Sequence, residues 1–188
     1  MNKAIFLDRD GTINVDKQYL YRIEDFEFLP KVKEALLEFQ KMGYLLIIVT
    51  NQSGIARGYY SEDEYLMLSN WLRSELMLYG VHIEKEYYCP HHENSIFSKY
   101  RVHCNCRKPR LGMYEKAIEE YQLDIENCIA VGDKFRDCAV ALKYPMKAFL
   151  IGTNEKSDIV NRVKSGEYAS IFYAKTLYNV AEILKSTK

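Results

Sequence analysis

The sequence lacks an excess of charge of either sign. Its 188 residues contain 26 Lys and Arg against 26 Asp and Glu, so the formal net charge is zero. A chain with this balance has no general electrostatic attraction for nucleic acid or for an anionic membrane. We therefore expect neither as a partner.

Long apolar runs and export signals are also missing. The longest apolar run, Tyr44–Val49, is far too short to span a bilayer. The N-terminal stretch MNKAIFLDRDG becomes polar after four apolar residues, unlike a signal peptide. The five cysteines are an odd number, and without an export signal we expect reduced thiols rather than disulfides. These absences predict a cytoplasmic protein.

No linker, repeat or low-complexity segment divides the chain, so we predict one domain over residues 1–188. Hydrophobic residues make up 48% of it, enough for a sizeable core. Short apolar runs alternate with longer amphipathic segments. Strands are expected at residues 4–7, 45–50, 84–88, 128–132, 147–152 and 170–173, and helices at 32–42, 61–79, 113–121, 135–142 and 176–185.

This alternation predicts an α/β fold with a mostly parallel sheet and helices on both faces. In such a sheet, ligands bind beyond the carboxyl ends of the strands. Polar clusters follow three of the buried runs, at Asp8–Thr12, Thr50–Gly54 and Gly132–Asp137. Three clusters at equivalent strand ends predict one shared site.

The first and third clusters offer carboxylates. Asp8 and Asp10 lie two residues apart where a strand ends, and Gly11 allows the chain to turn there. Together with Asp133 they form a hard oxygen site suited to Mg²⁺. The alternatives are a common Asp-x-Asp-Gly surface turn at residues 8–11, and capping of the following helix by Asp133 and Asp137.

Three further groups could meet a phosphate. Thr50 could hydrogen-bond a phosphoryl oxygen, and the amides of residues 51–54 could form an anion-binding concavity. Lys108 could bring positive charge to a transferring group. The alternatives are an ordinary βα turn at residues 50–54 and a solvated basic pair at Arg107–Lys108.

The segments DRDGT, TNQSG, RKP and GDKFRD, in this order, resemble the four motifs of the haloacid-dehalogenase-like phosphohydrolases. The resemblance covers residues 8–137, and the flanking sequence is consistent with the fold. It implies a Rossmann-like, doubly wound sheet and an aspartyl-phosphate intermediate.

The resemblance also implies a role for each matching residue. Asp8 would be the nucleophile, and Asp10 the general acid that protonates the leaving group and then the base that activates water. Thr50 and Lys108 would hold the phosphoryl oxygens. The ligands of the catalytic Mg²⁺ would be the carboxylates of Asp8 and Asp133 and the backbone carbonyl of Asp10.

A receiver domain of a signalling protein is an alternative from another class. Receivers also combine a doubly wound sheet, an acceptor aspartate, Mg²⁺, a threonine and a lysine, but they store phosphate. Their acceptor ends an internal strand, with acidic ligands earlier in the chain. Here Asp8 ends the first strand and Asp10 follows it, which favours hydrolysis.

A zinc site is expected in the segment at about residues 89–109, CPHHENSIFSKYRVHCNCRKP, which holds three of the five cysteines and three of the four histidines. Soft Cys and His ligands select zinc rather than magnesium. His92 and His103 suit the site less well, because neighbouring residues cannot easily face one ion. A loop with reduced cysteines and surface histidines is the alternative. The four expected ligands are Cys89, His91, Cys104 and Cys106.

CPHH and CNCRKP resemble the zinc-loop subgroup of the family, which includes heptose-bisphosphate phosphatases and the phosphatase half of bifunctional histidine-biosynthesis enzymes. Members have minimal caps, and the zinc would be structural. The zinc would hold the loop that carries Arg107 and Lys108. By this resemblance, the residues that contact substrate are Asp16, Lys17, Gln18, Tyr19, Asn51, Gln52, Ser53, Arg107 and Lys134.

The expected substrate is a small phosphorylated sugar. NVDKQYLY resembles the heptose branch, and Arg107 suits a second phosphate. The reaction would remove the 7-phosphate of D-glycero-D-manno-heptose 1,7-bisphosphate and leave heptose 1-phosphate for ADP- or GDP-heptose biosynthesis. Histidinol phosphate is the first alternative, and general sugar-phosphate or nucleotide clearance the second. No patch indicates a dimer interface, so we expect a monomer.

Overall fold

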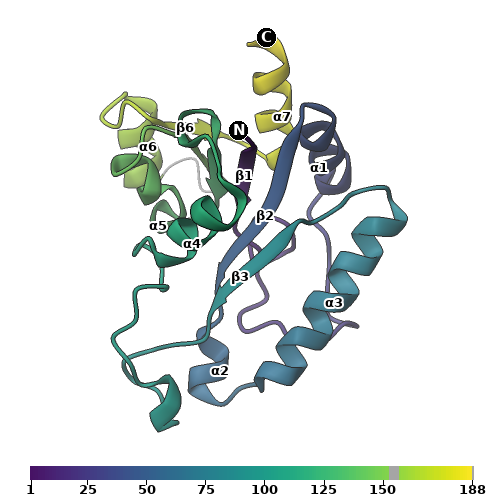
Figure 1. The fold of residues 1–188 in the computed structure, drawn as a ribbon, viewed down its shortest axis with the longest axis vertical. Helices are drawn as coiled ribbons and strands as arrows, with labels where there is room; N and C mark the ends of the chain where they lie inside the picture. The colour runs from purple at the N-terminus through teal and green to yellow at the C-terminus, as the bar shows by residue number, and fades with distance from the viewer. Residues whose placement is uncertain (153–156, 188) are drawn as a thin grey trace.

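The computed structural model describes residues 1–152 and 157–187, and a six-stranded sheet forms its centre (Figure 1). All neighbouring strands are parallel, in the order β3-β2-β1-β4-β5-β6. The predicted α/β fold is confirmed, and the sheet is wholly rather than mostly parallel. The strands are β1 (Lys3–Leu7), β2 (Tyr44–Asn51), β3 (Lys85–Cys89), β4 (Ile129–Gly132), β5 (Lys147–Ile151) and β6 (Ile171–Ala174).

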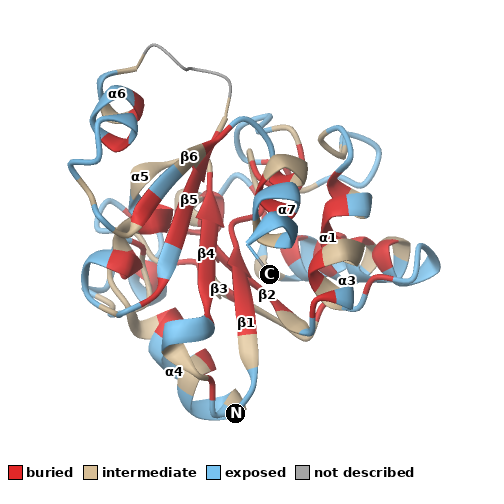
Figure 2. Cartoon of the chain, turned by 90° about the horizontal axis from the view of Figure 1, so that it is seen from above, coloured by how far each residue is buried: buried red, intermediate tan, exposed pale blue. Residues whose placement is uncertain are grey.

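Helices cover both faces of this sheet (Figure 2). One face carries α1 (Val32–Lys41), α3 (Glu62–Leu78) and α7 (Leu177–Ser186), and the other carries α4 (Gly112–Tyr121), α5 (Phe135–Cys138) and α6 (Asp158–Lys164). Successive strand side chains point to opposite faces. In β1, Ile5 and Leu7 therefore enter the first core, whereas Ala4 and Phe6 enter the second.

The helix boundaries follow local signals where such signals exist. Ser61 and Glu64 form the expected capping box, in which each residue accepts a hydrogen bond from the backbone amide of the other. The expected helix at residues 135–142 is instead divided into α5 and a 3₁₀ turn at Ala139–Leu142. The helices α2 (Ser53–Arg57) and α6 were not expected, because short helices produce little periodic pattern.

The strand order places a ligand site between β1 and β4. These neighbours have their crossover connections on opposite sides, which makes their carboxyl ends the switch point of the sheet. The segment from residue 90 to 111 contains only a short 3₁₀ helix, Ser98–Tyr100, and runs beside α2 at the same end of the molecule (Figure 1). This segment fits the predicted minimal cap. Among the described residues, no helix is long and apolar enough to cross a membrane.

Candidate active site

The adjacent strands β1 and β4 bring two predicted metal ligands together. Asp8 directly follows β1, and its amide donates a hydrogen bond to Val131 O at 3.0 Å. Asp133 directly follows β4. Carboxylate oxygens of Asp8, Asp133 and Asp137 all lie within 4.8 Å of one another. The structure therefore adds Asp137 to the carboxylates that meet at the switch point. From the sequence Asp137 was considered only as a helix cap, and its Oδ2 does accept a hydrogen bond from the Lys134 amide at 3.0 Å.

Together, these three carboxylates fit a divalent cation such as Mg²⁺, which prefers oxygen ligands. Asp133 Oδ1 is buried and has no hydrogen-bond partner in the protein, an arrangement that a cation would satisfy. Burial also raises the pKa of Asp133, and a bound cation would oppose that rise. Gly11 provides the space for this side chain, because a Cβ at residue 11 would clash with the Asp133 carboxylate.

Lys108 lies between two buried carboxylates. Its Nζ is 2.8 Å from Asp8 Oδ1 and 2.8 Å from Asp137 Oδ1, and it also donates to Val49 O at 2.5 Å. Burial alone would lower the pKa of Lys108, but the two carboxylates outweigh burial and raise it. Burial raises the pKa of Asp8 to about 7 against the opposing effect of Lys108. Lys108 is therefore a fixed cation, not a solvated surface lysine.

Asp10 has a different environment from Asp8. Its carboxylate accepts hydrogen bonds from Arg9 Nη2 at 2.9 Å, from Asn14 Nδ2 at 3.0 Å and from Gln52 Nε2 at 3.0 Å. Burial alone would raise the pKa of Asp10, but Arg9 and the hydrogen bonds hold it below its usual range. The pKa values of Asp8 and Asp10 are therefore shifted in opposite directions. Asp8 is buried beside Lys108 and its pKa is raised, whereas Asp10 pairs with Arg9 and its pKa is lowered.

Arg9 was not among the predicted site residues. Its side chain is fully buried, and its Nη2 also donates to Leu20 O at 3.1 Å. The guanidinium lies over the ring of Tyr65, 5.5 Å from the ring centroid. A buried charge requires a partner. The sequence places an aspartate on each side of Arg9, and this arrangement could have predicted an internal ion pair.

Gln52 was predicted to contact substrate, but its side chain faces inward. Only 2% of it is exposed, and Nε2 donates to Thr50 Oγ1 at 3.0 Å as well as to Asp10. Its Oε1 accepts from Tyr60 OH at 2.5 Å. The Gln52 backbone amide donates to Cys89 O at 2.8 Å, so it is not available for the anion-binding concavity expected at residues 51–54.

Asn51 connects the end of β2 to the segment that carries Lys108. Its Nδ2 donates to Lys108 O at 3.1 Å, and its Oδ1 accepts from Lys108 N at 3.0 Å. A side-chain amide that pairs with both backbone polar groups of one residue fixes the position of that residue. Asn51 thereby helps to place Lys108 against Asp8.

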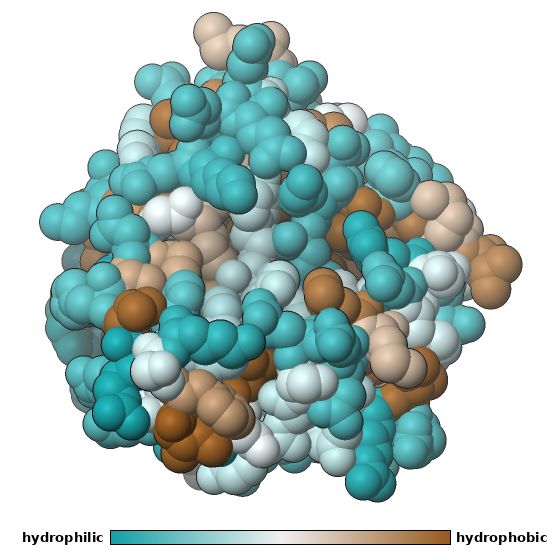
Figure 3. Space-filling view, turned by 60° about the horizontal axis from the view of Figure 1, so that its bottom comes forward, coloured by the Kyte–Doolittle hydropathy of each residue, from teal (hydrophilic) through white to brown (hydrophobic). Residues whose placement is uncertain are grey.

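A cavity of about 440 Å³ opens over these residues. It lies on the side of the molecule where the strands end, and Figure 3, which brings that side forward, shows a largely hydrophilic surface with separate hydrophobic patches. Both aspartates of the DRDGT segment and Thr50 line the cavity. Eight of the nine predicted substrate-contacting residues do so too: Asp16, Gln18, Tyr19, Asn51, Gln52, Ser53, Arg107 and Lys134.

Lys17 is the predicted contact that does not line this cavity; it forms an ion pair with Glu27 at 3.2 Å. Lys134 lies on the cavity wall, 3.1 Å from Asp16 and 2.8 Å from Asp133. The sequence did not indicate three other lining residues: Arg57, Tyr60 and Arg136.

The four predicted zinc ligands form one cluster, with all their ligand atoms within 4.8 Å of one another. Cys89 Sγ lies 3.6 Å from Cys104 Sγ and 3.1 Å from Cys106 Sγ, and His91 Nδ1 lies 3.2 Å from Cys106 Sγ. A tetrahedral zinc–thiolate site separates its sulfurs by roughly 3.8 Å, so the donor set and spacing fit zinc. His92 and His103 stay outside the cluster and contact Arg57 and Arg110.

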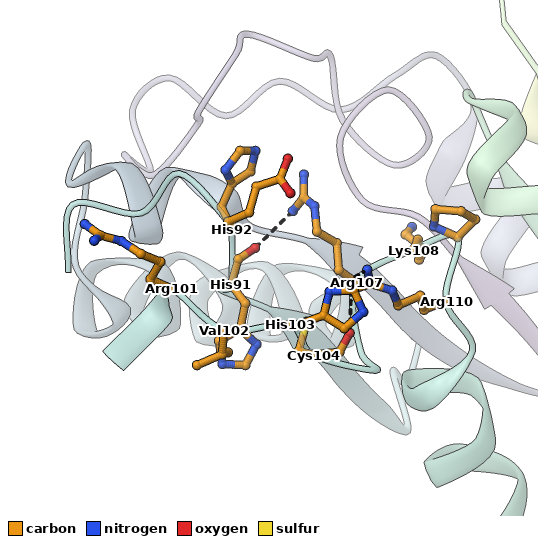
Figure 4. Close-up of a pocket in the computed structure, with 11 residues that line it drawn as sticks. His91, His92, Arg101, Val102, His103, Cys104, Arg107, Lys108 and Arg110 are labelled. Carbon is orange, nitrogen blue, oxygen red and sulfur yellow. Dashed lines mark hydrogen bonds between the residues drawn. The ribbon is translucent and has the colours of Figure 1, made fainter. Parts of the chain in front are cut away.

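Two arginines hold the backbone of this cluster (Figure 4). Arg107 reaches across to the carbonyl of His91, with Nη1 at 3.3 Å, and Arg110 Nη1 donates to the carbonyl of Cys104 at 2.7 Å. They line a second cavity of about 450 Å³, and Arg107 lines the first cavity as well. Arg107 therefore contacts the Cys/His cluster through His91 and also lines the cavity over Asp8.

A family model described as polynucleotide kinase 3 phosphatase matches residues 3–160. The chain is also 42% identical over 193 residues to D-glycero-beta-D-manno-heptose-1,7-bisphosphate 7-phosphatase of Haemophilus influenzae, in an alignment that covers 100% of both chains. The protein belongs to the haloacid-dehalogenase-like phosphatase family. Because this family consists of phosphatases, the receiver alternative is wrong.

Two further members of the family support this assignment. D-glycero-alpha-D-manno-heptose-1,7-bisphosphate 7-phosphatase of Campylobacter jejuni is 43% identical over 156 residues, which are 83% of this chain and 86% of the relative. The crystal structure of D,D-heptose 1,7-bisphosphate phosphatase from B. bronchiseptica, complexed with magnesium and phosphate, matches with a TM-score of 0.81 at 26% identity over 100% of both chains. The magnesium in that relative is the kind of cation that the carboxylates of Asp8, Asp133 and Asp137 would suit.

Proposed function

We propose that this phosphatase removes the 7-phosphate of D-glycero-D-manno-heptose 1,7-bisphosphate and releases heptose 1-phosphate for ADP- or GDP-heptose biosynthesis. One structural observation carries the proposal. A single cavity is lined by Asp8 and Asp10 and also by the cations Arg107 and Lys134. Asp8 suits the phosphate that reacts, and the guanidinium of Arg107 suits the phosphate that stays. The relatives named above act on this class of sugar bisphosphate.

In the first half of the reaction, a carboxylate oxygen of Asp8 attacks phosphorus and the bond between phosphorus and the sugar oxygen breaks. Asp10 gives its proton to the departing alkoxide. In the second half, water attacks the aspartyl phosphate, Asp10 takes a proton from that water, and the bond from Asp8 to phosphorus breaks. The protein thus returns to its starting state with inorganic phosphate released.

Asp10 must therefore be protonated when the sugar departs, although Arg9 holds its pKa low in the free protein. A phosphate group that enters the cavity adds negative charge close to Asp10, and a neighbouring like charge raises the pKa of a carboxyl. Substrate binding itself then favours the acid form that the first step needs.

The remaining roles concern charge and position. Asp8 and Asp133, with the backbone carbonyl of Asp10, would hold Mg²⁺, which when bound supplies positive charge that reduces the repulsion between carboxylate and phosphate. Thr50 holds a phosphoryl oxygen, and Lys108, whose three N–H donors are used inside the protein, supplies positive charge beside the transferring group. The sugar and its second phosphate contact residues on the cavity wall, which are Asp16, Gln18, Tyr19, Asn51, Ser53, Arg107 and Lys134. Lys17 lies outside this cavity and is left out of the proposed contacts.

Zinc at the Cys/His cluster has a structural role in this proposal. Four protein ligands complete a tetrahedral site and leave no position for substrate. Arg107 and Lys108 follow the last ligand, Cys106, directly, so the cluster fixes the loop that delivers both cations. The zinc ligands need reduced thiols, which supports a cytoplasmic location, and we retain a monomer and the absence of a nucleic-acid partner as predictions.

Histidinol phosphate is the second candidate substrate. It has one phosphate and carries an amine, so Arg107 would have no second phosphate to bind and would repel its positive charge. The test is a comparison of kcat/KM on both anomers of the heptose bisphosphate and on histidinol phosphate. We expect the heptose bisphosphate to be preferred, and a preference for histidinol phosphate would overturn the proposed substrate.

A further inference from the structure

The side chain of Gln52 connects Asp10 to Thr50 within the active site. Its two N–H donors are both used inside the protein, one on Asp10 Oδ2 and one on Thr50 Oγ1, each at 3.0 Å. A glutamine amide has no third N–H to offer a substrate. Asp10 follows β1 and Thr50 is the penultimate residue of β2, so this amide links the proposed acid and the phosphoryl-binding hydroxyl across neighbouring strands.

Tyr60 determines which way the Gln52 amide points. The tyrosine hydroxyl donates to Gln52 Oε1 at 2.5 Å. If the amide turned over, its oxygen would face the Asp10 carboxylate, and two acceptors would meet without a proton between them. The hydroxyl bond therefore selects the orientation in which both N–H groups face their acceptors.

Packing holds Tyr60 in this place. Only 5% of the residue is exposed, and its ring lies parallel to that of Tyr21, with centroids 5.5 Å apart and an interplanar angle of 17°. It also packs so closely on Gly54 that a Cβ there would clash with the ring. A side chain confined by such contacts can impose its geometry on its hydrogen-bond partner.

We infer that Tyr60 and Gln52 form a positioning relay, in which Tyr60 orients the Gln52 amide and the amide orients Asp10 and Thr50 for phosphoryl transfer. Gln52 is then a positioning residue and not a substrate contact. This inference rests on the proposed function, because it assigns Asp10 and Thr50 the parts described above.

The relay predicts changes in kcat rather than KM. Tyr60→Phe keeps the ring and removes the hydroxyl, and we expect kcat to fall roughly 10-fold with KM nearly unchanged, because reacting groups lose alignment but substrate contacts remain. Gln52→Ala should lower kcat roughly 100-fold. The matched control is Tyr59→Phe, which removes a hydroxyl from the adjacent, 54% exposed tyrosine outside the active-site cavity and should leave kcat unchanged.

A double-mutant cycle separates the relay from two independent effects. Because Tyr60 acts through Gln52, Tyr60→Phe should have no further effect on kcat in the Gln52→Ala background. Additive losses would overturn the relay, as would a Gln52→Ala variant with raised KM and unchanged kcat, the result expected of a substrate contact. Equal melting temperatures of Tyr60→Phe and wild type would exclude unfolding as the cause.

A measurement on the substrate-free protein tests the relay independently of the proposed function. In ¹⁵N NMR spectra, the Gln52 side-chain amide protons should exchange slowly with solvent in wild type and in Tyr59→Phe, and faster in Tyr60→Phe. Unchanged exchange in Tyr60→Phe would reject the relay whatever the substrate is. A wild-type protein without activity on heptose bisphosphate would instead reject the proposed function.

Discussion

Lys108 Nζ lies 2.8 Å from Asp8 Oδ1, although the two residues are 100 positions apart in the sequence. Both side chains are almost completely buried, and the ammonium group also lies 2.8 Å from a second carboxylate, that of Asp137. This contact joins the first strand to the loop that follows the Cys/His cluster. It connects the proposed nucleophile with the cation that would neutralise the transferring group.

Asp8→Asn should abolish phosphate release and leave the fold and the zinc content unchanged. The amide keeps the size of the side chain, but it is too weak a nucleophile to form the acyl-phosphate intermediate. Lys108 keeps an ion-pair partner, because Asp137 lies 2.8 Å away. Released phosphate, circular dichroism and metal analysis would be measured together, and retained turnover would remove Asp8 as the nucleophile.

Lys108→Met should abolish activity and also lower the free energy of unfolding by about 3–5 kcal/mol, because two buried carboxylates lose their cation. Urea unfolding in the absence of added metal would measure this. The control is Lys85→Met, whose half-exposed ammonium pairs with Glu120 at 3.3 Å. Removal of that surface pair should change the stability by less than about 1 kcal/mol. Similar losses in the two variants would contradict the buried role of Lys108.

Magnesium affinity should weaken as the pH falls below neutrality. Burial raises the pKa of Asp8 to about 7 in the metal-free protein, so below that pH the carboxyl holds a proton. The proton and Mg²⁺ compete for the same oxygens, and Kd should therefore rise by about tenfold for each pH unit below 7. Titration calorimetry at pH 6 and pH 8 would measure the effect. An equal Kd at the two pH values would show that Asp8 is already ionised without the metal.

Zinc should be present at about one ion per chain, as a four-ligand site requires. Cys104→Ser should lower the zinc content and the activity together, because the loop before Arg107 loses its anchor, while the parallel sheet remains folded. Cys128→Ala is the matched control, since this buried cysteine lies outside the cluster. The Cys128→Ala protein should therefore keep its full zinc content. Full activity in a folded, zinc-free Cys104→Ser protein would contradict the structural role.

Gly11→Ala should weaken magnesium binding by about tenfold or more, because the added methyl group would displace the Asp133 carboxylate. Gly80→Ala is a close control: the two glycines have φ angles of 85° and 86°, but nothing lies within 4 Å of a Cβ at residue 80. Both variants should lose about 1–2 kcal/mol of stability from backbone strain. Only Gly11→Ala should change the Mg²⁺ Kd, measured by calorimetry.

The order of the strands along the chain and the place of the site were predictable from the sequence. Apolar runs such as LLIIVT and CIAVG show buried parallel strands, because hydrophobic periodicity is a local property of the chain. The polar residues that follow such runs meet at one edge of the sheet by the geometry of parallel strands. The grouping of the four Cys and His ligands was also predicted correctly, because their chemistry restricts which residues can meet.

The sequence by itself thus determined the fold class, the family motifs, the Cys/His cluster and two of the three carboxylates that meet beyond β1 and β4. Only the tertiary structure decided how side chains are shared within the site. It pairs Lys108 with Asp137 as well as Asp8, turns Gln52 inward to Asp10 and Tyr60, and leaves Lys17 outside the cavity. These pairings join distant segments, and the partner that a buried polar group finds depends on which segments exclude water around it.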